Sequence, residues 1–406
     1  MRFLRTVSTR RLLASLAGAL VAVVAGTAIA VAASASGPVP PRSSLAKALH
    51  RALAAPKVNG ISARISFTNH LISSSDILGS DPILTGASGR LWLSSGHRMR
   101  LELQSDNGDA QVVVNGRSFW ISEPSAHTVY KGTLPAGAKT SKHRSASPTD
   151  TLPSVAKIQS ELSRVMQHVN VSGALSSDVA NHAAYTVRVS PKHDGGLLGA
   201  AKFAWDAARG VPLRFAIFAR GSSTPVLELK ATDVSYGPVN ASTFDVSPPS
   251  GAKVVKISMP TGHPGTAAAA RMHARHTGHV SGVAAVSRKL PFALDAPKSL
   301  AGLPRRGVTL LELGGHPAAL VTYGQNLGGI AVIEGAGHPG ASPPPQSGRS
   351  RDGNGLSLPT VSINGSTGQE LDTALGTVLR FTRSGVAFTV VGSVPPVAAE
   401  NAARGL

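Results

Sequence analysis

Apolar and polar residues alternate along much of the chain between residues 61 and 256. In the stretch 97–106, Met99, Leu101 and Leu103 fall on one side of an extended segment, whereas Arg100 and Glu102 fall on the other. A period of two is typical of half-buried β-strands in antiparallel sheets. Similar alternation occurs at 61–71, 89–96, 183–192, 200–221, 225–237 and 244–257.

A β-hairpin is predicted within residues 108–130, where two apolar runs flank Asn115-Gly116. Asn-Gly favours a type I′ turn, because both central residues of that turn need positive φ. This turn would place Val112 opposite Phe119 and Ala110 opposite Ile121. The hairpin then has one apolar face, which covers either an ordinary core or a ligand.

Three segments have helical patterns. Ser44 precedes Leu45, Leu49 and Leu53, and Pro56 and Gly60 follow, so a short amphipathic helix is expected. After a polar loop at 136–150, apolar residues recur with helical spacing from 155 to 169, and the tail 394–406 suits a short C-terminal helix. Strands resume after the second helix, where Phe203 and Trp205 share one face.

Composition divides the chain into two predicted domains. With 406 residues, 42% of them hydrophobic, the chain is long enough for two cores. Residues 44–256 form the first domain. Residues 257–290, with four His, four basic residues and no acid, are predicted to be a linker. Residues 291–406 are predicted to be a smaller, mainly β domain with a disordered insertion at 335–355.

The N-terminus predicts export. Arg2, Arg5, Arg10 and Arg11 precede an apolar run at 12–33, and a small-residue cleavage site lies before Ser36. Residues 1–35 are therefore expected to be a signal peptide or, since the run is long, an uncleaved signal anchor. The paired arginines leave both Sec and twin-arginine export open. The chain has no cysteine, so it forms no disulfide bond and is not anchored through a lipidated cysteine.

The net charge of +19 points to an anionic partner surface. The basic residues are scattered and aromatics make up only 4% of the chain, so nucleic acid is not expected and an anionic cell envelope is. Abundant Ala, Gly and Arg suggest a GC-rich bacterial source.

No motif predicts catalysis or a cofactor, and no metal site is expected. The chain contains no nucleophile elbow, HExxH, P-loop or CxxC. An HxxHxxH array at 273–279 lacks a nearby carboxylate and is interpreted as a solvated tract, and DNGD at 106–109 is interpreted as a polar turn rather than a Ca²⁺ site. The tryptophans, Trp92, Trp120 and Trp205, suit either core packing or the mouth of a lipid cavity.

The strands of the first domain resemble a known family. The stretches GRLWLSSGHRMRLEL, VVVNGRSFWISEPSAHTVYK, AYTVRVSPK, FAWDAARGVPLRFAIFARG and LELKATDVSYGPVNASTFDVSPPSGAKV are similar to the LolA/LolB lipoprotein carrier superfamily. They also resemble the N-terminal domain of RseB/MucB sigma-E regulators, especially actinobacterial exported members. This resemblance covers roughly residues 60–256.

The resemblance implies a fold and a function. The expected fold is α+β and mostly β: a strongly curved antiparallel sheet, an unclosed barrel covered by helices. The implied function is noncatalytic binding of a lipid or acylated lipoprotein in the concave face, in the periplasm or extracytoplasmic envelope. The lining expected from these alternating positions is Leu91, Leu93, Leu101, Leu103, Val112, Val114, Phe119, Ile121, Phe203, Trp205, Phe215 and Ile217.

An alternative follows from the extra C-terminal domain, which ordinary carriers lack. Residues 376–406 resemble C-terminal modules of exported regulatory proteins. The chain is then an envelope-stress sensor that regulates an anti-sigma factor or another membrane-bound partner.

Overall fold

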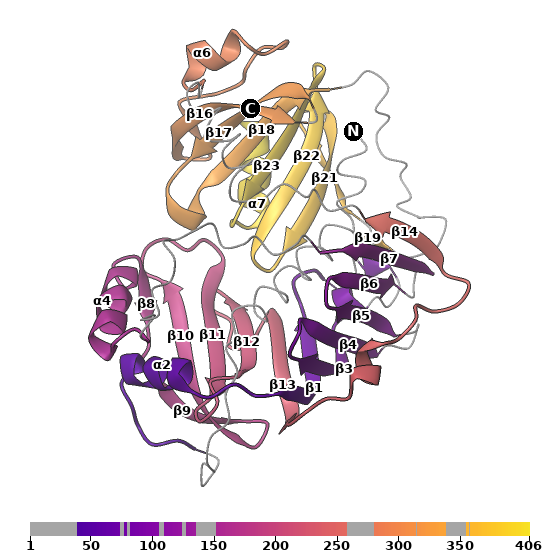
Figure 1. Cartoon of the computed structure of the whole chain (residues 1–406). Helices are drawn as coiled ribbons and strands as arrows, with labels where there is room; N and C mark the ends of the chain where they lie inside the picture. The colour runs from indigo at the N-terminus through magenta and orange to yellow at the C-terminus, as the bar shows by residue number, and fades with distance from the viewer. Residues whose placement is uncertain are drawn as a thin grey trace.

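The computed structural model contains two large sheets, antiparallel throughout except for one parallel strand pair at an edge of the first sheet (Figure 1). It describes residues 39–73, 77–78, 82–104, 109–123, 127–134, 152–257, 280–313, 315–337, 355–356 and 358–406. The signal segment, the HxxHxxH array and residues 106–108 of DNGD lie outside these ranges.

The first sheet has 13 strands and curls strongly without closing into a barrel. Its strand order is β14-β7-β6-β5-β4-β3-β1-β13-β12-β11-β10-β8, and β9 also pairs with β10. The strands are β1 (Gly60–Asn69), β3 (Ala87–Ser94), β4 (Arg98–Gln104), β5 (Ala110–Asn115), β6 (Ser118–Glu123), β7 (Thr128–Thr133), β8 (Val169–Val171), β9 (Leu175–Val179), β10 (His182–Pro191), β11 (Leu198–Asp206), β12 (Pro212–Ala219), β13 (Leu227–Tyr236) and β14 (Lys253–Ile257). The predicted architecture, mostly β with a curved open sheet and few helices, is confirmed.

Short helices accompany this sheet: α2 (Leu45–Ala54), α3 (Pro82–Thr85), α4 (Val155–Val165) and the 3-10 turn η2 (Ala241–Phe244). The side chains of Ser44 and Ser154 cap α2 and α4 by accepting hydrogen bonds from the third backbone N–H that follows each of them. The segment after η2 packs against the outside of β5–β7, where Trp120 Nε1 donates to Val246 O at 3.1 Å.

The β5–β6 hairpin corrects the predicted register. Val112 pairs with Ile121 and Val114 with Phe119, so the two-residue loop is Gly116-Arg117 rather than Asn115-Gly116. Gly116 takes a φ of 63° at the first central position, where a type II′ turn needs glycine. The slip is two residues, so the same side chains still share one face.

The second sheet has eight strands in the order β15-β16-β17-β18-β23-β22-β21-β20. These are β15 (Ser299–Leu300), β16 (Leu303–Leu313), β17 (His316–Tyr323), β18 (Ile330–Ala336), β20 (Thr360–Ile363), β21 (Ser366–Thr373), β22 (Gly376–Arg383) and β23 (Val386–Gly392). The helices with it are α6 (Val283–Ser287), η4 (Asn326–Gly328) and α7 (Pro396–Arg404), and α7 occupies the predicted C-terminal helix. Ala402, Ala403 and Leu406 of this C-terminal segment are buried in the core of the sheet.

The core of the second sheet begins before residue 291. Val280, Val286 and Leu290 join this core, although they fall in the range predicted as a linker. They are held there because Leu310 N donates to Val280 O and Gly282 N donates to Val308 O, which extends the edge of β16. The rest of that range, 258–279, lies outside the described residues. So does 338–354 of the predicted insertion, after which β19 (Gly355–Leu356) pairs with β2 (Ile77–Leu78).

A buried carboxyl group sits inside the second core. Glu334 of β18 is fully buried, and its Oε2 accepts a hydrogen bond from Asp295 N at 2.9 Å. Its Oε1 and the hydroxyl of the buried Tyr323 have no hydrogen-bond partner among the described residues. Burial, partly offset by the bond from Asp295 N, raises the pKa of Glu334 from 4.5 to about 7. Glu334 therefore connects the segment before β15 to the sheet through the hydrogen bond from Asp295 N. Burial disfavours the charged form of its carboxyl group.

This environment predicts a pH-dependent stability. Between pH 4.5 and 7 the folded chain keeps a proton on Glu334 that the unfolded chain has released, so the contribution of Glu334 to stability falls as pH rises through this range. Glu334→Gln should be more stable than wild type by about 3 kcal/mol at pH 8 and nearly equal to it at pH 4.

Calorimetric unfolding at the two pH values measures the difference. Glu161→Gln, at an exposed position of α4, is the control and should show no such change with pH. A stability difference between Glu334→Gln and wild type that is the same at both pH values would contradict the assignment.

Candidate functional site

One face of the first sheet is apolar, and we call it the core face. It carries the buried residues Ile61, Ala63, Leu101 and Leu103. Of the twelve predicted lining residues, ten belong to core clusters. Leu91, Leu93 and Val112 link the cluster of Leu101 and Leu103 to that of Val114, Phe119 and Ile121, and Phe203 and Trp205 lie in a third.

Helix α2 covers the core face over β10 and β11. Leu45, Leu49 and Ala52 join the cluster that contains Tyr185 and Trp205, both of which are buried. The hydroxyl of Tyr185 donates to Pro41 O at 2.7 Å, and Arg51 Nη1 lies 3.4 Å from the same hydroxyl. The helix and the chain before it are therefore fixed by both apolar packing and polar contacts.

Between α2 and the larger clusters, part of the core face is left open. A cross-strand row runs from β10 to β1 through Val187, Phe203, Phe215, Leu229 and Phe67. Phe67 is 8% exposed, whereas Phe215 in the middle of the row is 44% exposed. Phe215 and its neighbour Ile217 are the two predicted lining residues that belong to no core cluster formed by the described residues.

Two half-buried residues that border this opening were missing from the predicted lining. Leu229 pairs with Phe215 and Leu227 pairs with Ile217, so both extend the apolar strip onto β13. Their alternation with Glu228 and Lys230 was visible in the sequence. This alternation already places Leu227 and Leu229 on one face of a predicted strand, as it does Phe215 and Ile217.

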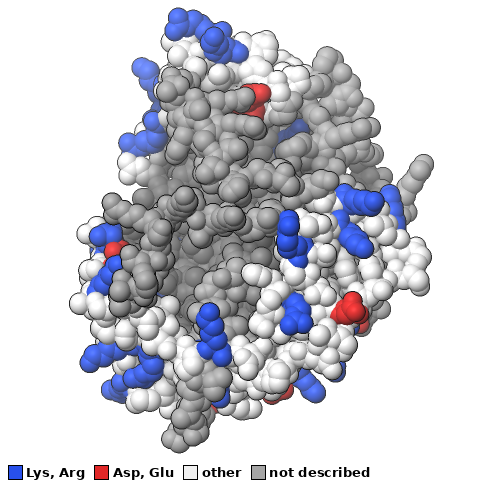
Figure 2. Space-filling view, viewed as in Figure 1, with Lys and Arg blue, Asp and Glu red and all other residues white. Residues whose placement is uncertain are grey.

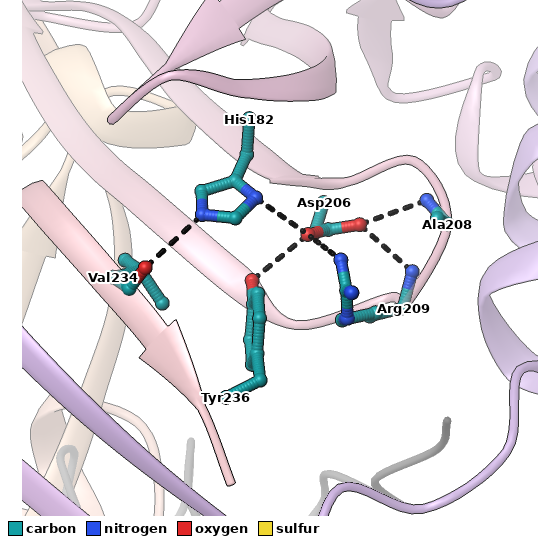
Figure 3. Close-up of polar contacts among 6 residues, drawn as sticks. All are labelled: His182, Asp206, Ala208, Arg209, Val234 and Tyr236. Atoms are coloured by element: carbon teal, nitrogen blue, oxygen red, sulfur yellow. Dashed lines mark hydrogen bonds and ion pairs between the residues drawn. The ribbon is translucent and has the colours of Figure 1, made fainter. Parts of the chain in front are cut away.

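A polar network holds the end of the sheet beside α2 (Figure 3). Asp206, 2% exposed, accepts hydrogen bonds from Ala208 N and Arg209 N, both at 2.8 Å, and from the Tyr236 hydroxyl at 2.9 Å. His182 Nδ1 and Arg209 Nη1 each lie 3.5 Å from the Asp206 carboxylate. The β11–β12 turn, β10 and β13 are thus joined through one carboxylate.

The network is suited to a structural role. Burial and the negative charge of Asp206 raise the pKa of Tyr236 well above its ordinary value, so the phenol stays protonated and donates. The other ring nitrogen of His182 lies 3.2 Å from Val234 O, so both nitrogens face fixed partners. Next to the turn, Gly210 has a φ of 68° and lies against Ala52 O of α2, where a side chain would not fit.

The other candidates from the sequence are distributed over both faces. Trp205 is in the core under α2, Trp120 is buried on the opposite face, and Trp92 is half-buried beside Arg100, whose Cζ lies 5.4 Å from the indole ring centre. Among the described residues, no three His, Asp or Glu side chains are grouped closely enough to hold a metal ion. Nor does any helix in the described ranges have the length and apolarity to cross a membrane.

Comparisons with known proteins give structural matches only. No protein-family model matches the sequence, and no curated protein matches it. The structure is similar to MucB in complex with MucA(peri), with 14% identity and a TM-score of 0.38 over 88% of this chain and 97% of that one. The MucA/MucB complex of Pseudomonas aeruginosa matches with 15% identity and a TM-score of 0.39 over 88% and 96%.

A LolA superfamily protein from Nitrosomonas europaea also matches, with 8% identity and a TM-score of 0.19 over 50% of this chain and 98% of that one. The matches name both families that the sequence resembles. The half-barrel architecture itself follows from the strand order given above.

The polar network predicts a large loss of stability in Asp206→Ala. The substitution leaves two backbone N–H groups and the Tyr236 hydroxyl without their acceptor, so the free energy of unfolding should fall by about 3 kcal/mol. Chemical denaturation followed by tryptophan fluorescence reports on this sheet, because the three tryptophans all lie in its strands. Asp178→Ala, at an exposed position of β9, should change stability by less than about 0.5 kcal/mol. Equal effects of the two substitutions would contradict the assigned role.

Proposed function

We propose that this chain is an exported, noncatalytic protein of the LolA-like class that holds the acyl chains of a lipid or lipoprotein against the open part of the core face. The observation that carries the proposal is the 44% exposure of Phe215 in the middle of an apolar row whose other members are buried or half-buried. Phe215 and the half-buried residues Ile217, Leu227 and Leu229 form one partly exposed apolar patch, and contiguous apolar patches mark binding surfaces in soluble proteins. A linear hydrocarbon chain fits a strip bordered by Ile217, Leu227 and Leu229.

Apolar contact alone supplies the affinity for such a ligand. Each buried methylene contributes about 0.8 kcal/mol, so a fatty acyl chain needs no polar recognition along its length. This agrees with the residues around Phe215, which are Phe203, Ile217 and Leu229. It also accounts for a binding function without any catalytic motif in the sequence.

The proposed location is the extracytoplasmic cell envelope, with an anionic membrane surface nearby. The arginine-rich start followed by a long apolar run supports export. Figure 2 shows Lys and Arg spread over the visible face with few Asp and Glu among them. This distribution, together with a net charge of +19, favours encounter with anionic lipids.

Phe215→Glu tests the acyl-binding proposal. A carboxylate at this position must be desolvated under a bound chain, so affinity for a fluorescent fatty-acid probe should fall at least about tenfold. The melting temperature should stay close to that of wild type, because the side chain is already accessible to water. The measurements are probe titration and thermal unfolding of the same preparations.

Two further variants make the result specific. Leu175→Glu changes a residue that is 53% exposed on β9 and outside the open strip, so probe binding should be retained. Phe119→Glu changes a buried core residue and should lower the melting temperature strongly. Absence of probe binding by wild type, or unchanged binding by Phe215→Glu, would refute the proposal.

The second candidate function is an envelope-stress sensor similar to RseB/MucB, with a membrane-bound regulatory partner. It is favoured by direct contacts between the two sheets. Leu197 N, before β11, donates to Ser393 O at 3.0 Å and to its Oγ at 2.9 Å, and Ala374 N donates to Leu71 O at 2.8 Å. Gly328 lies against the Asp194 carboxylate with no room for a side chain.

These contacts supply a physical route from the binding strip to the second sheet. Leu197 immediately precedes β11, and β11 carries Phe203 of the apolar row. A ligand that displaces β11 would therefore act on the Leu197–Ser393 hydrogen bonds. A carrier has no need of such coupling, whereas a sensor requires it.

Hydrogen exchange separates the two candidate functions. For a sensor, saturating fatty-acid probe should increase exchange at the amides of Leu197 and Ala374 several-fold, because both donate between the sheets. For a carrier, exchange at these amides should not change. Phe215→Glu serves as the unliganded control, and an increase that persists in this variant would show that the effect does not arise from the open strip.

A further inference from the structure

Two arginines face each other on the side of the first sheet opposite the core face. Arg64 of β1 pairs directly with Arg90 of β3, and both are exposed. Cβ atoms of directly opposed residues in antiparallel strands lie about 4.5–5.5 Å apart, and like charges at this distance destabilise the pairing. Two directly opposed carboxylates, Asp233 beside Arg64 and Glu102 beside Arg90, offset part of this penalty, and a bound anion removes the rest.

Two further arginines of this face have acidic partners. Arg100 forms an ion pair with Glu102, and Arg214 forms one with Glu228. Arg64 and Arg90 have no ion pair or hydrogen bond from their side chains among the described residues. Ten guanidinium N–H donors are therefore available at one place.

The two arginines line a shallow, open depression. It is lined by Ser62, Ala63, Arg64, Arg90, Trp92, Asp233 and Ser235, and its volume is ≈ 170 Å³. The guanidinium group of Arg100 packs on the Trp92 ring. Arg100 also donates hydrogen bonds to Glu102 and to Thr243 O. The depression thus combines two forked cations, an aromatic ring and hydroxyl groups.

The backbone at one wall is irregular. The register between β1 and β13 shifts between Arg64 and Ile65, so that Thr232 is an extra residue in β13. Bulges of this kind redirect neighbouring side chains. Here the bulge adjoins Asp233, which lies opposite Arg64 and is the sole carboxylate among the residues that line the depression.

We propose that this depression is a binding site for a phosphate group. Paired guanidinium groups match the oxygen atoms of phosphate with two-pronged hydrogen bonds, and the exposed depression admits a phosphate ester. Such a group belongs either to a phospholipid headgroup or to a soluble phosphate compound. The site lies on the opposite face from Phe215, so it does not depend on the acyl-binding proposal.

The first test uses inorganic phosphate and the full chain at constant ionic strength. Calorimetric titration should show binding that is at least about tenfold weaker in Arg64→Gln/Arg90→Gln than in wild type. The matched control is Arg188→Gln/Lys202→Gln, which removes another directly opposed cationic pair of β10 and β11, outside the depression. This control should bind phosphate as wild type does.

Asp233→Asn provides a variant with the opposite effect. Removing this carboxylate removes repulsion of the ligand, so phosphate affinity should rise about threefold or more, whereas a cation site would lose affinity. Melting temperatures verify that each variant is folded. Equal weakening in both double variants, or an unchanged affinity in Arg64→Gln/Arg90→Gln, would overturn the proposal.

Vesicles then distinguish the two sources of phosphate. Sedimentation with phosphatidylglycerol and phosphatidylcholine vesicles at equal proportions is compared with pure phosphatidylcholine. If Arg64→Gln/Arg90→Gln loses both vesicle and phosphate binding, the site takes a lipid headgroup. If it loses phosphate binding but sediments with vesicles as wild type does, the site takes a soluble phosphate compound.

Discussion

An open sheet with one apolar face must have that face covered, and this requirement governs the first half of the molecule. A closed barrel covers its interior with its own strands, but a curled sheet that stops short of closure does not. Over β3–β7 the core face packs against Ile83 of α3, and Leu134 and the edge-strand residues Val255 and Ile257 of β14 join the same cluster. Over β10 and β11 the cover comes from α2. The strip on β12 around Phe215 remains between these two covers, and that is why it is the part available to a ligand.

The alternation that builds this face has to change phase once, in β13. Leu227, Leu229 and Ala231 are the apolar positions before Thr232, whereas Val234 and Tyr236 are the apolar positions after it. The extra residue Thr232 keeps both sets on the core face. Without it, Asp233 and Ser235 would turn inward. Tyr236 would also lose the position from which its hydroxyl reaches the Asp206 carboxylate.

The sequence could predict the strands and their faces, since both depend on local alternation. The β5–β6 hairpin illustrates the limit: the register was wrong by two residues, yet Val112, Val114, Phe119 and Ile121 share one face as expected. A slip of an even number of residues preserves the face, so alternation alone does not detect it. Turn chemistry decides the register, and Gly116 suits the first central position of a II′ turn as well as the second of a I′ turn.

Exposure could not be predicted in the same way, because it depends on which distant segment covers each strand. Phe119 follows Ser118 and Phe215 follows Arg214 in similar alternating strands, but Phe119 packs in a core cluster and Phe215 does not. The opposed pair of Arg64 and Arg90 was equally hidden. These residues lie in strands separated by β2 and α3, and no turn signal fixes the register between them.

The two faces of β1, β3 and β13 therefore differ in chemical character: one is apolar, and the other carries charged side chains. Ala63 and Leu91 pair on the core face, and the next residues along the same strands, Arg64 and Arg90, pair on the opposite one. Because alternate side chains point to opposite faces, a substitution at Arg90 leaves the apolar packing of Leu91 in place. The bulge at Thr232 is the exception, since it fixes the positions of Ala231 on the core face and Asp233 beside the arginines. Any movement of β13 that straightened this bulge would disturb both faces together.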